Sequence, residues 1–247
     1  MKVAIHQPQY FPWSPYVHKV MSADIFVYLD TVQFSKNGVQ NRNQIKTASG
    51  PLWLTLPVKH EFGHRISETR IVDLRAIEKH WKTLLANYSR SPGFLRWHEE
   101  LKALLQTDTD SLANIAIAST EWMLEKLDVK TKRIKASELS GVEGSASTLV
   151  ASICKSLGAD EYLTGSGALS YLNPDDFACR IMVQHWRPFE YEQAHPRAGF
   201  VPDLSALDLL LNCPDTAANM ISSAGSWKPL ESEPQKSTKG TRQICEK

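Results

Sequence analysis

The sequence has no long hydrophobic run and no excess of charge of either sign. No stretch reaches the roughly 18 apolar residues of a membrane-spanning helix. The opening, MKVAIHQPQYFPW, lacks the apolar core of a secretory signal because His6, Gln7 and Gln9 interrupt it. The net charge of +1 provides no overall attraction for DNA, RNA or an anionic membrane. We therefore expect a cytoplasmic protein with no membrane insertion and no nucleic-acid partner.

Cysteine is scarce, and the common phosphate-binding motifs are missing. The 4 cysteines are scattered without a C-x-x-C pair, which favours reduced thiols over a disulfide framework or a zinc site. Neither a P-loop nor G-x-G-x-x-G is present. Residues 60–64 match the zinc-protease pattern H-E-x-x-H, but Gly63 and strand-like flanks favour a hairpin loop over the helix that this pattern requires. We predict no metal site.

The residues that are present form an ordinary globular composition. The 247-residue chain is 42% hydrophobic and 22% charged, so it can bury a core without covalent staples. The end of the chain is rich in Ser, Lys and Glu and has almost no apolar residues. We therefore expect a single domain over residues 1–228 and a disordered tail over residues 229–247.

Strand-like apolar runs alternate with amphipathic segments along the chain. We predict strands at residues 2–6, 24–30, 52–58, 68–74, 133–135, 161–165 and 181–186. We predict helices at residues 15–23, 78–88, 93–105, 110–127, 145–157, 204–211 and 215–222, with Asp110 as one helix cap. Residues 31–50 are polar and irregular. This pattern indicates an α/β protein with a Rossmann-like, mostly parallel sheet, flanking helices and a mainly helical middle segment.

The loop after the first predicted strand is the strongest candidate site. Ligands of open α/β sheets bind at the carboxyl ends of the strands. This loop also leads into a helix N-terminus, whose free N–H groups suit a phosphate or carboxylate. The alternative is that its aromatic residues pack in the core. The candidate residues are His6, Gln7, Tyr10, Trp13, His18 and Lys19.

A second candidate set follows the second predicted strand. It combines one carboxylate, several amides and two cations, which could bind phosphate, carboxylate, amide or sugar groups. Its length without a clear element favours a functional loop, and the alternative is a polar surface loop. The residues are Asp30, Gln33, Asn41, Arg42, Asn43 and Lys46.

Two weaker candidates lie elsewhere. The turn at Gly165 and Ser166 follows a predicted strand and could present backbone N–H groups to an anion, although a plain tight turn is an equal alternative. His80 falls within a predicted helix and could either reach the site or be buried in the core.

Several of these segments resemble the WbqC-like family. The resemblance is carried by HQPQYFPW, ADIFVYLDTVQF, QNRNQIK, LWLTLPV, KHWKTLLANYSRSPGF, ICKSLGADEYLTGSGALSYL and GFVPDLSALDLLLN, which together run from about residue 3 to residue 220. It implies a role in bacterial gene clusters for O-antigen and related surface polysaccharides. To the candidates above, the resemblance adds Tyr171 and Asp208. The first blocks are also similar to nucleotidylyltransferase-type Rossmann folds, in which His6 and His18 would be the phosphate-binding histidines.

Within that pathway, our first hypothesis is a transferase that moves an acyl, aminoacyl or nucleotidyl group. The substrate would be a nucleotide-activated amino sugar or an acyl donor, and ATP or another nucleotide is the candidate cofactor. His6 or His18 would act as acid, base or phosphate binder, Asp30 would orient an amine or a metal-bound phosphate, and Arg42 and Lys46 would stabilise developing negative charge. The alternative is a non-catalytic binding or assembly protein of the same pathway. The sequence leaves the oligomeric state open.

Overall fold

A six-stranded sheet forms the centre of the fold. The computed structural model describes residues 1–36, 38–59, 61 and 63–231, and within them the strand order is β10-β9-β8-β1-β2-β7. The five strands from β9 to β7 are parallel, and β10 runs antiparallel to β9. These results confirm the predicted α/β class with a Rossmann-like sheet. The strands are β1 (Lys2–His6), β2 (Ile25–Tyr28), β7 (Lys132–Lys135), β8 (Glu161–Thr164), β9 (Arg180–Trp186) and β10 (Gly225–Pro229).

The order of the strands creates a switch point between β1 and β8. The chain builds outward from β1 to β2 and β7, and then returns to the other side of β1 to add β8 and β9. The connections after β1 and β8 therefore diverge. In such sheets, the crevice outside the carboxyl ends of the two central strands is the usual ligand site.

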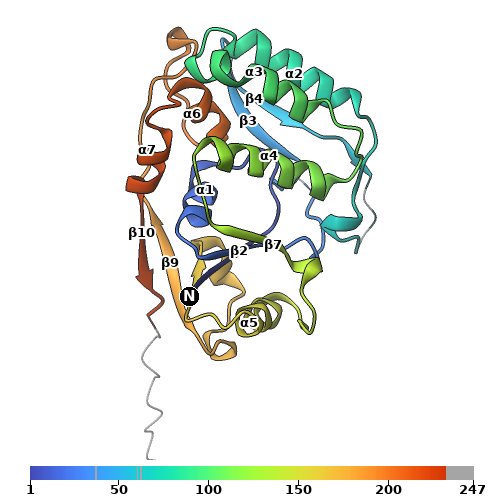
Figure 1. Cartoon of the computed structure of the whole chain (residues 1–247), viewed down its shortest axis with the longest axis vertical. Helices are drawn as coiled ribbons and strands as arrows, with labels where there is room; N and C mark the ends of the chain where they lie inside the picture. The colour runs from blue at the N-terminus through green and yellow to red at the C-terminus, as the bar shows by residue number, and fades with distance from the viewer. Residues whose placement is uncertain (37, 60, 62, 232–247) are drawn as a thin grey trace, which may run out of the picture.

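Helices cover both faces of the sheet, which explains the continuous apolar runs in its strands. Val3 and Ile5 pack with helix α5 (Ala146–Ser156), whereas Ala4 joins the larger core that contains α1 (Ser14–Met21) and α4 (Leu112–Lys126). Figure 1 shows α1 and α4 on one side of β2 and β7 and α5 on the other. Because successive strand residues point to opposite faces, both faces need apolar side chains.

The remaining elements cover the larger core. They lie mostly at the end of the molecule farthest from the chain's N-terminus, where Figure 1 shows α2 and α3 beside the β3–β4 hairpin. None of the helices in the described ranges has the length and apolarity needed to cross a bilayer. These elements are β3 (Arg42–Thr47), β4 (Gly50–Thr55), β5 (Val58–Lys59), β6 (Arg70–Ile71), α2 (Arg75–Tyr88), α3 (Pro92–Leu105), α6 (Ala206–Asn212) and α7 (Ala217–Ala224).

Two strands were not predicted. Strand β3 lies within the supposedly irregular residues 31–50, because its polar sequence RNQIKT pairs along its whole length with β4 and buries Ile45. Strand β10 follows what we predicted to be the last strand and pairs with β9. The predicted pairing of residues 52–58 with 68–74 is wrong over most of its length, because β4 pairs with β3 and only the short strands β5 and β6 meet.

Two local predictions also change. Ser111, not Asp110, caps α4, because its hydroxyl accepts a hydrogen bond from the backbone N–H of Asn114 at 3.4 Å. Pro229, which we placed in the tail, is the last residue of β10. Residues 232–247 of the predicted tail lie outside the described residues.

Candidate functional site

A pocket of about 250 Å³ lies at the switch point, between the carboxyl ends of β1 and β8. Five of the predicted site residues line it: His6, Gln7, Lys19, Gly165 and Tyr171. Three separate stretches of the chain supply them, namely the end of β1, helix α1 and the segment after β8. The remaining lining residues are Ile5, Leu29, Val150, Tyr162, Thr164, Gly167 and Ala168.

Lys19 is the main charged group of this pocket. Its side chain comes from α1 and is only 4% exposed. No described residue forms an ion pair or hydrogen bond with its ammonium group. Desolvation by burial lowers the pKa of Lys19 to about 8, so the amine is still mainly protonated at neutral pH. A buried positive charge without a protein partner favours an anionic ligand.

His6 lies at the end of β1 and lines the same pocket. Its Nδ1 is 3.1 Å from the carbonyl oxygen of Gln7, which makes Nδ1 the donor and leaves Nε2 as the acceptor. Burial and, second, the charge of Lys19 lower the pKa of His6 to about 3. The imidazole is therefore neutral at neutral pH, and it can accept a proton or a hydrogen bond rather than provide a positive charge.

Gln7 and Tyr171 add uncharged polar groups. The side-chain amide of Gln40 donates to Gln7 Oε1 at 2.6 Å, which orients the Gln7 amide and leaves its Nε2 as a donor. Tyr171 is 47% exposed and also lines the pocket. Together with Lys19, these groups provide hydrogen-bond donors beside apolar lining residues such as Ile5 and Leu29.

The loop between β1 and α1 is held in an unusual backbone conformation. Phe11 has φ of 45°, which is a strained value for a bulky side chain. Its N–H donates to Ser119 Oγ at 2.9 Å, and its carbonyl accepts from Asn43 Nδ2 and from Ser205 Oγ, both at 2.7 Å. These three bonds maintain the strain and fix the loop that carries Gln7.

Tyr10, Asn43 and His80 support this loop from inside the core instead of lining the pocket. The Tyr10 hydroxyl lies 3.0 Å from His80 Nδ1, and both residues are buried. Burial lowers the pKa of His80 to about 4, which keeps the imidazole neutral in this interior contact. Of the two alternatives for His80, the structure therefore places it in the core.

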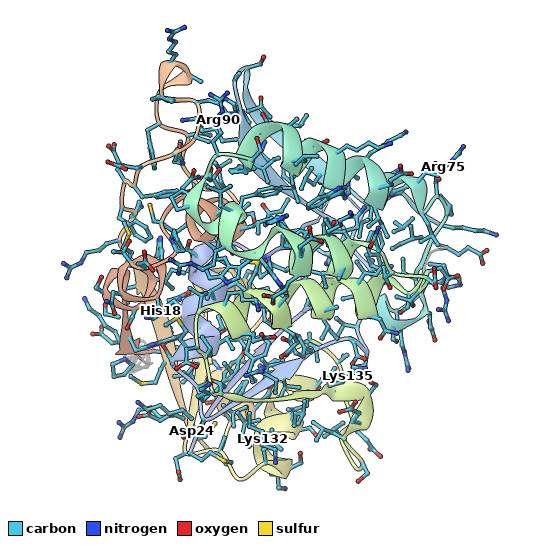
Figure 2. All side chains as sticks on the ribbon, turned by 45° about the horizontal axis from the view of Figure 1, so that its top comes forward. His18, Asp24, Arg75, Arg90, Lys132 and Lys135 are labelled. Carbon is cyan, nitrogen blue, oxygen red and sulfur yellow. The ribbon has the colours of Figure 1, made fainter. Side chains whose placement is uncertain are left out.

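His18 points away from the pocket. It is buried where α1 packs against β9 and β10, and it lies on the α7 and β10 side of the molecule in Figure 2. Its Nδ1 is 2.8 Å from the amide nitrogen of Gln184, and its ring stacks on Trp227 with 5.7 Å between centroids. Burial lowers its pKa. The structure does not bring His6 and His18 together as a pair.

Asp30 is also separated from the pocket. It is 2% exposed, and its two carboxylate oxygens accept hydrogen bonds from the backbone N–H and the hydroxyl of Ser137, at 3.0 Å and 2.6 Å. Asp30 therefore does not line the pocket that contains His6. The residue of this segment that lines the pocket is Leu29.

Three other predicted residues make contacts in and around the β3–β4 hairpin. Asn41 Nδ2 donates to the Leu56 carbonyl at 2.8 Å, and Lys46 Nζ donates to the Gly199 carbonyl at 2.5 Å. The guanidinium of Arg42 lies 4.5 Å from the centre of the Trp53 ring. These side chains contact other parts of the protein and do not line the pocket.

Three further predicted residues also lie outside the lining of this pocket. Gln33 is exposed and forms a β-bridge with Arg65. Ser166 is exposed beside Gly165, and Trp13 lines a different pocket.

Sequence reasoning missed Thr164 and Gly167 as lining residues, although both lie at or just after the end of a predicted strand. The metal prediction remains a prediction, because His60 and Phe62 of the H-E-x-x-H segment lie outside the described residues. Within residues 1–36, 38–59, 61 and 63–231, no group of three or more His, Cys, Asp or Glu side chains is arranged to hold a metal ion.

Comparisons with known proteins find one family and one relative. Residues 7–220 match the model of the WbqC-like protein family. The chain is 31% identical over 218 residues to the uncharacterized protein Rv1507c of Mycobacterium tuberculosis, and the match covers 85% of this chain and 93% of that protein. No solved structure matches the chain.

Proposed function

Because the chain belongs to the WbqC-like protein family, we propose that it is a transferase of bacterial surface polysaccharide (O-antigen) biosynthesis. Its substrate is a nucleotide-activated amino sugar or an acyl donor, and the reaction takes place in the pocket of His6 and Lys19. The pathway in this proposal rests on the family resemblance. The chemistry rests on the pocket itself.

The observation that carries the proposal is the buried, unpaired ammonium of Lys19 at the switch point. Burial of a charge is costly unless a partner compensates it, and the described residues provide none. A phosphate oxygen of a nucleotide or an activated acyl group would be that partner. Gln7 would donate a further hydrogen bond, and the glycine turn after β8 leaves room for the ligand to approach the backbone.

His6 supplies the proton acceptor in this proposal. A hydroxyl or amine of the acceptor attacks the transferred group, the bond to the leaving phosphate or thiolate breaks, and Nε2 of His6 takes the proton of the nucleophile. Lys19 offsets the negative charge on the leaving group. A bound anion would also counter the charge of Lys19, and so raise the pKa of His6 from about 3 and make it a better base.

Thermal unfolding with matched ligands tests this proposal. Nucleoside diphosphates and nucleotide sugars at about 100 times their Kd should raise the melting temperature by about 5 °C, whereas the corresponding nucleosides should not. Lys19→Met should abolish the shift. Lys132→Met, which removes an exposed lysine from the edge strand β7 shown in Figure 2, should retain it.

Turnover is measured separately, by incubating the protein with those ligands and an amine or hydroxyl acceptor and following product by mass spectrometry. His6→Gln should keep the thermal shift and lose product formation. Equal shifts in the wild-type and Lys19→Met proteins would exclude this pocket as the phosphate site. Full turnover by His6→Gln would exclude His6 as the base.

A further inference from the structure

A second pocket of about 360 Å³ lies at the carboxyl end of β9, beside the start of α1. Ser14 and Pro15 line it from α1, and Trp186 lines it as the last residue of β9. Pro15 and Lys19 are four residues apart on the same helix, so the second pocket begins about one helical turn from the first. Neither the family match nor the proposed reaction assigns a role to this pocket.

One side of the second pocket is a row of four aromatic rings, which we call the aromatic wall: Trp186, Phe189, Tyr191 and Phe200. Successive ring centroids along the row are 5.9, 6.1 and 5.7 Å apart. Trp13 lines the same pocket from the loop before α1 and is 39% exposed. Large aromatic surfaces that remain in contact with solvent in a concave site are typical of ligand recognition.

Hydrogen bonds from the protein interior hold the aromatic wall in place. The Tyr191 hydroxyl donates to the buried carboxylate of Asp208 at 2.9 Å. The side-chain amide of Gln193 forms two hydrogen bonds with the backbone of Val201: it donates to the carbonyl at 2.8 Å and accepts from the N–H at 3.0 Å. The segment between β9 and α6 contains only a short 3-10 helix, and these bonds order it in advance. A pre-organised site loses less conformational entropy when a ligand binds.

The charge of the second pocket is opposite to that of the first. Glu190 and Asp203 line it, both are exposed, and neither is in an ion pair with a described residue. Its described lining contains no Lys, Arg or His. The faces of aromatic rings are electron-rich and the carboxylates add negative charge, so both features favour a cation.

We propose that the second pocket binds the ammonium group of a small ring-shaped amine. The aromatic wall and Trp13 would contact the ring and the cation, and Glu190 and Asp203 would pair with the ammonium group. The volume of about 360 Å³ has room for a ring-sized ligand. This inference is independent of the proposed transferase activity, because it uses no residue of the pocket that contains His6 and Lys19.

A pair of probes with the same shape tests the inference. Cyclohexylamine is protonated at neutral pH, and cyclohexanol is its uncharged counterpart. Binding is followed through the indole N–H signals of Trp13 and Trp186 in NMR spectra of the full chain, assigned with Trp13→Phe and Trp186→Phe. Both signals should shift with saturation, and cyclohexylammonium should bind about ten-fold more tightly than cyclohexanol.

The double variant Glu190→Gln, Asp203→Asn provides the matched control. Both side chains are exposed and keep their size, so the fold should be retained. The preference for the amine over the alcohol should fall from about ten-fold to about two-fold or less. Equal affinity for the two probes would overturn the inference. It would also be overturned by the absence of a saturable shift at these indoles, or by an unchanged preference in the double variant. None of these outcomes depends on nucleotide binding at Lys19.

Discussion

The ammonium of Lys19 lies over Gly165: a methyl group added at that glycine would stand 3.4 Å from Lys19 Nζ. Helix α1 and the turn after β8 thus approach each other across the carboxyl edge of the sheet. The helix contributes the positive charge of Lys19, and the turn contributes a glycine without a side chain. This relationship gives separate predictions for the two residues.

Replacement of Lys19 by methionine should stabilise the protein at neutral pH. Removing a buried charge without a partner should raise the free energy of unfolding by about 2 kcal/mol. The folded-state pKa of about 8 lies below the unfolded value, so the penalty is fully present below pH 8 and disappears as the pH rises toward the unfolded pKa. Urea unfolding of both proteins at pH 7 and about pH 10.5 checks this, and a variant less stable than wild type at pH 7 would contradict it.

Gly165→Ala should weaken phosphate binding without unfolding the protein. Gly165 has φ of −91°, which alanine adopts easily, and the added methyl makes only an ordinary contact with Lys19. It would nevertheless occupy space that the anion needs, and we expect a loss of affinity of about ten-fold, or 1.4 kcal/mol. Calorimetric titration with a nucleoside diphosphate measures it. Ser166→Ala is the control, because Ser166 is exposed beside Gly165 and does not line the pocket, and equal losses in both variants would refute the steric argument.

The His6 imidazole should show no titration between pH 5 and 8. Burial, followed by the charge of Lys19, lowers its pKa to about 3, so its NMR signals should move only in acid. The unfolded chain takes up this proton near pH 6.5, and therefore His6 reduces stability as the pH falls from that value toward 3. In Lys19→Met the pKa of His6 should rise. A wild-type midpoint near 6.5 would show that His6 is solvated and not part of an enclosed pocket.

Asp30→Asn should reduce stability and leave ligand binding unchanged. Both carboxylate oxygens accept bonds from Ser137, and a neutral amide in place of the carboxylate replaces these charge-assisted bonds with weaker ones. The expected loss in free energy of unfolding is about 2 kcal/mol. Chemical denaturation of Asp30→Asn, Ser137→Ala and the double variant should give a coupling of about 1 kcal/mol. Impaired nucleotide binding at unchanged stability would restore a ligand-binding role to Asp30.

The parallel core was predictable because its strands are covered on both faces. Val3, Ala4 and Ile5 form an uninterrupted apolar run, and such runs between helices indicate a parallel sheet. Strands β3 and β10 were not predicted because their sequences are polar. They form strands because they pair with β4 and β9, and their own composition does not indicate this pairing.

The sequence predicted residues after β1 and β8 that line one pocket, whereas tertiary partners determine where the other predicted residues lie. His18 and Lys19 are neighbours on a helix, where each residue turns by about 100°, so only one of them faces the pocket. Which one does so depends on where β8 and β10 lie. The partner of Asp30 is Ser137, 107 residues later in the chain, and no local pattern links the two.

The bonds around Phe11 make the opening loop dependent on segments that come much later in the chain. Ser119 belongs to α4, and Ser205 directly precedes α6. A nascent or truncated chain that ends before residue 205 can contain all of β1, α1 and β8 and still lack a group that holds Phe11 in its strained conformation. The His6 and Lys19 pocket therefore takes its final shape only once nearly the whole domain has been synthesised.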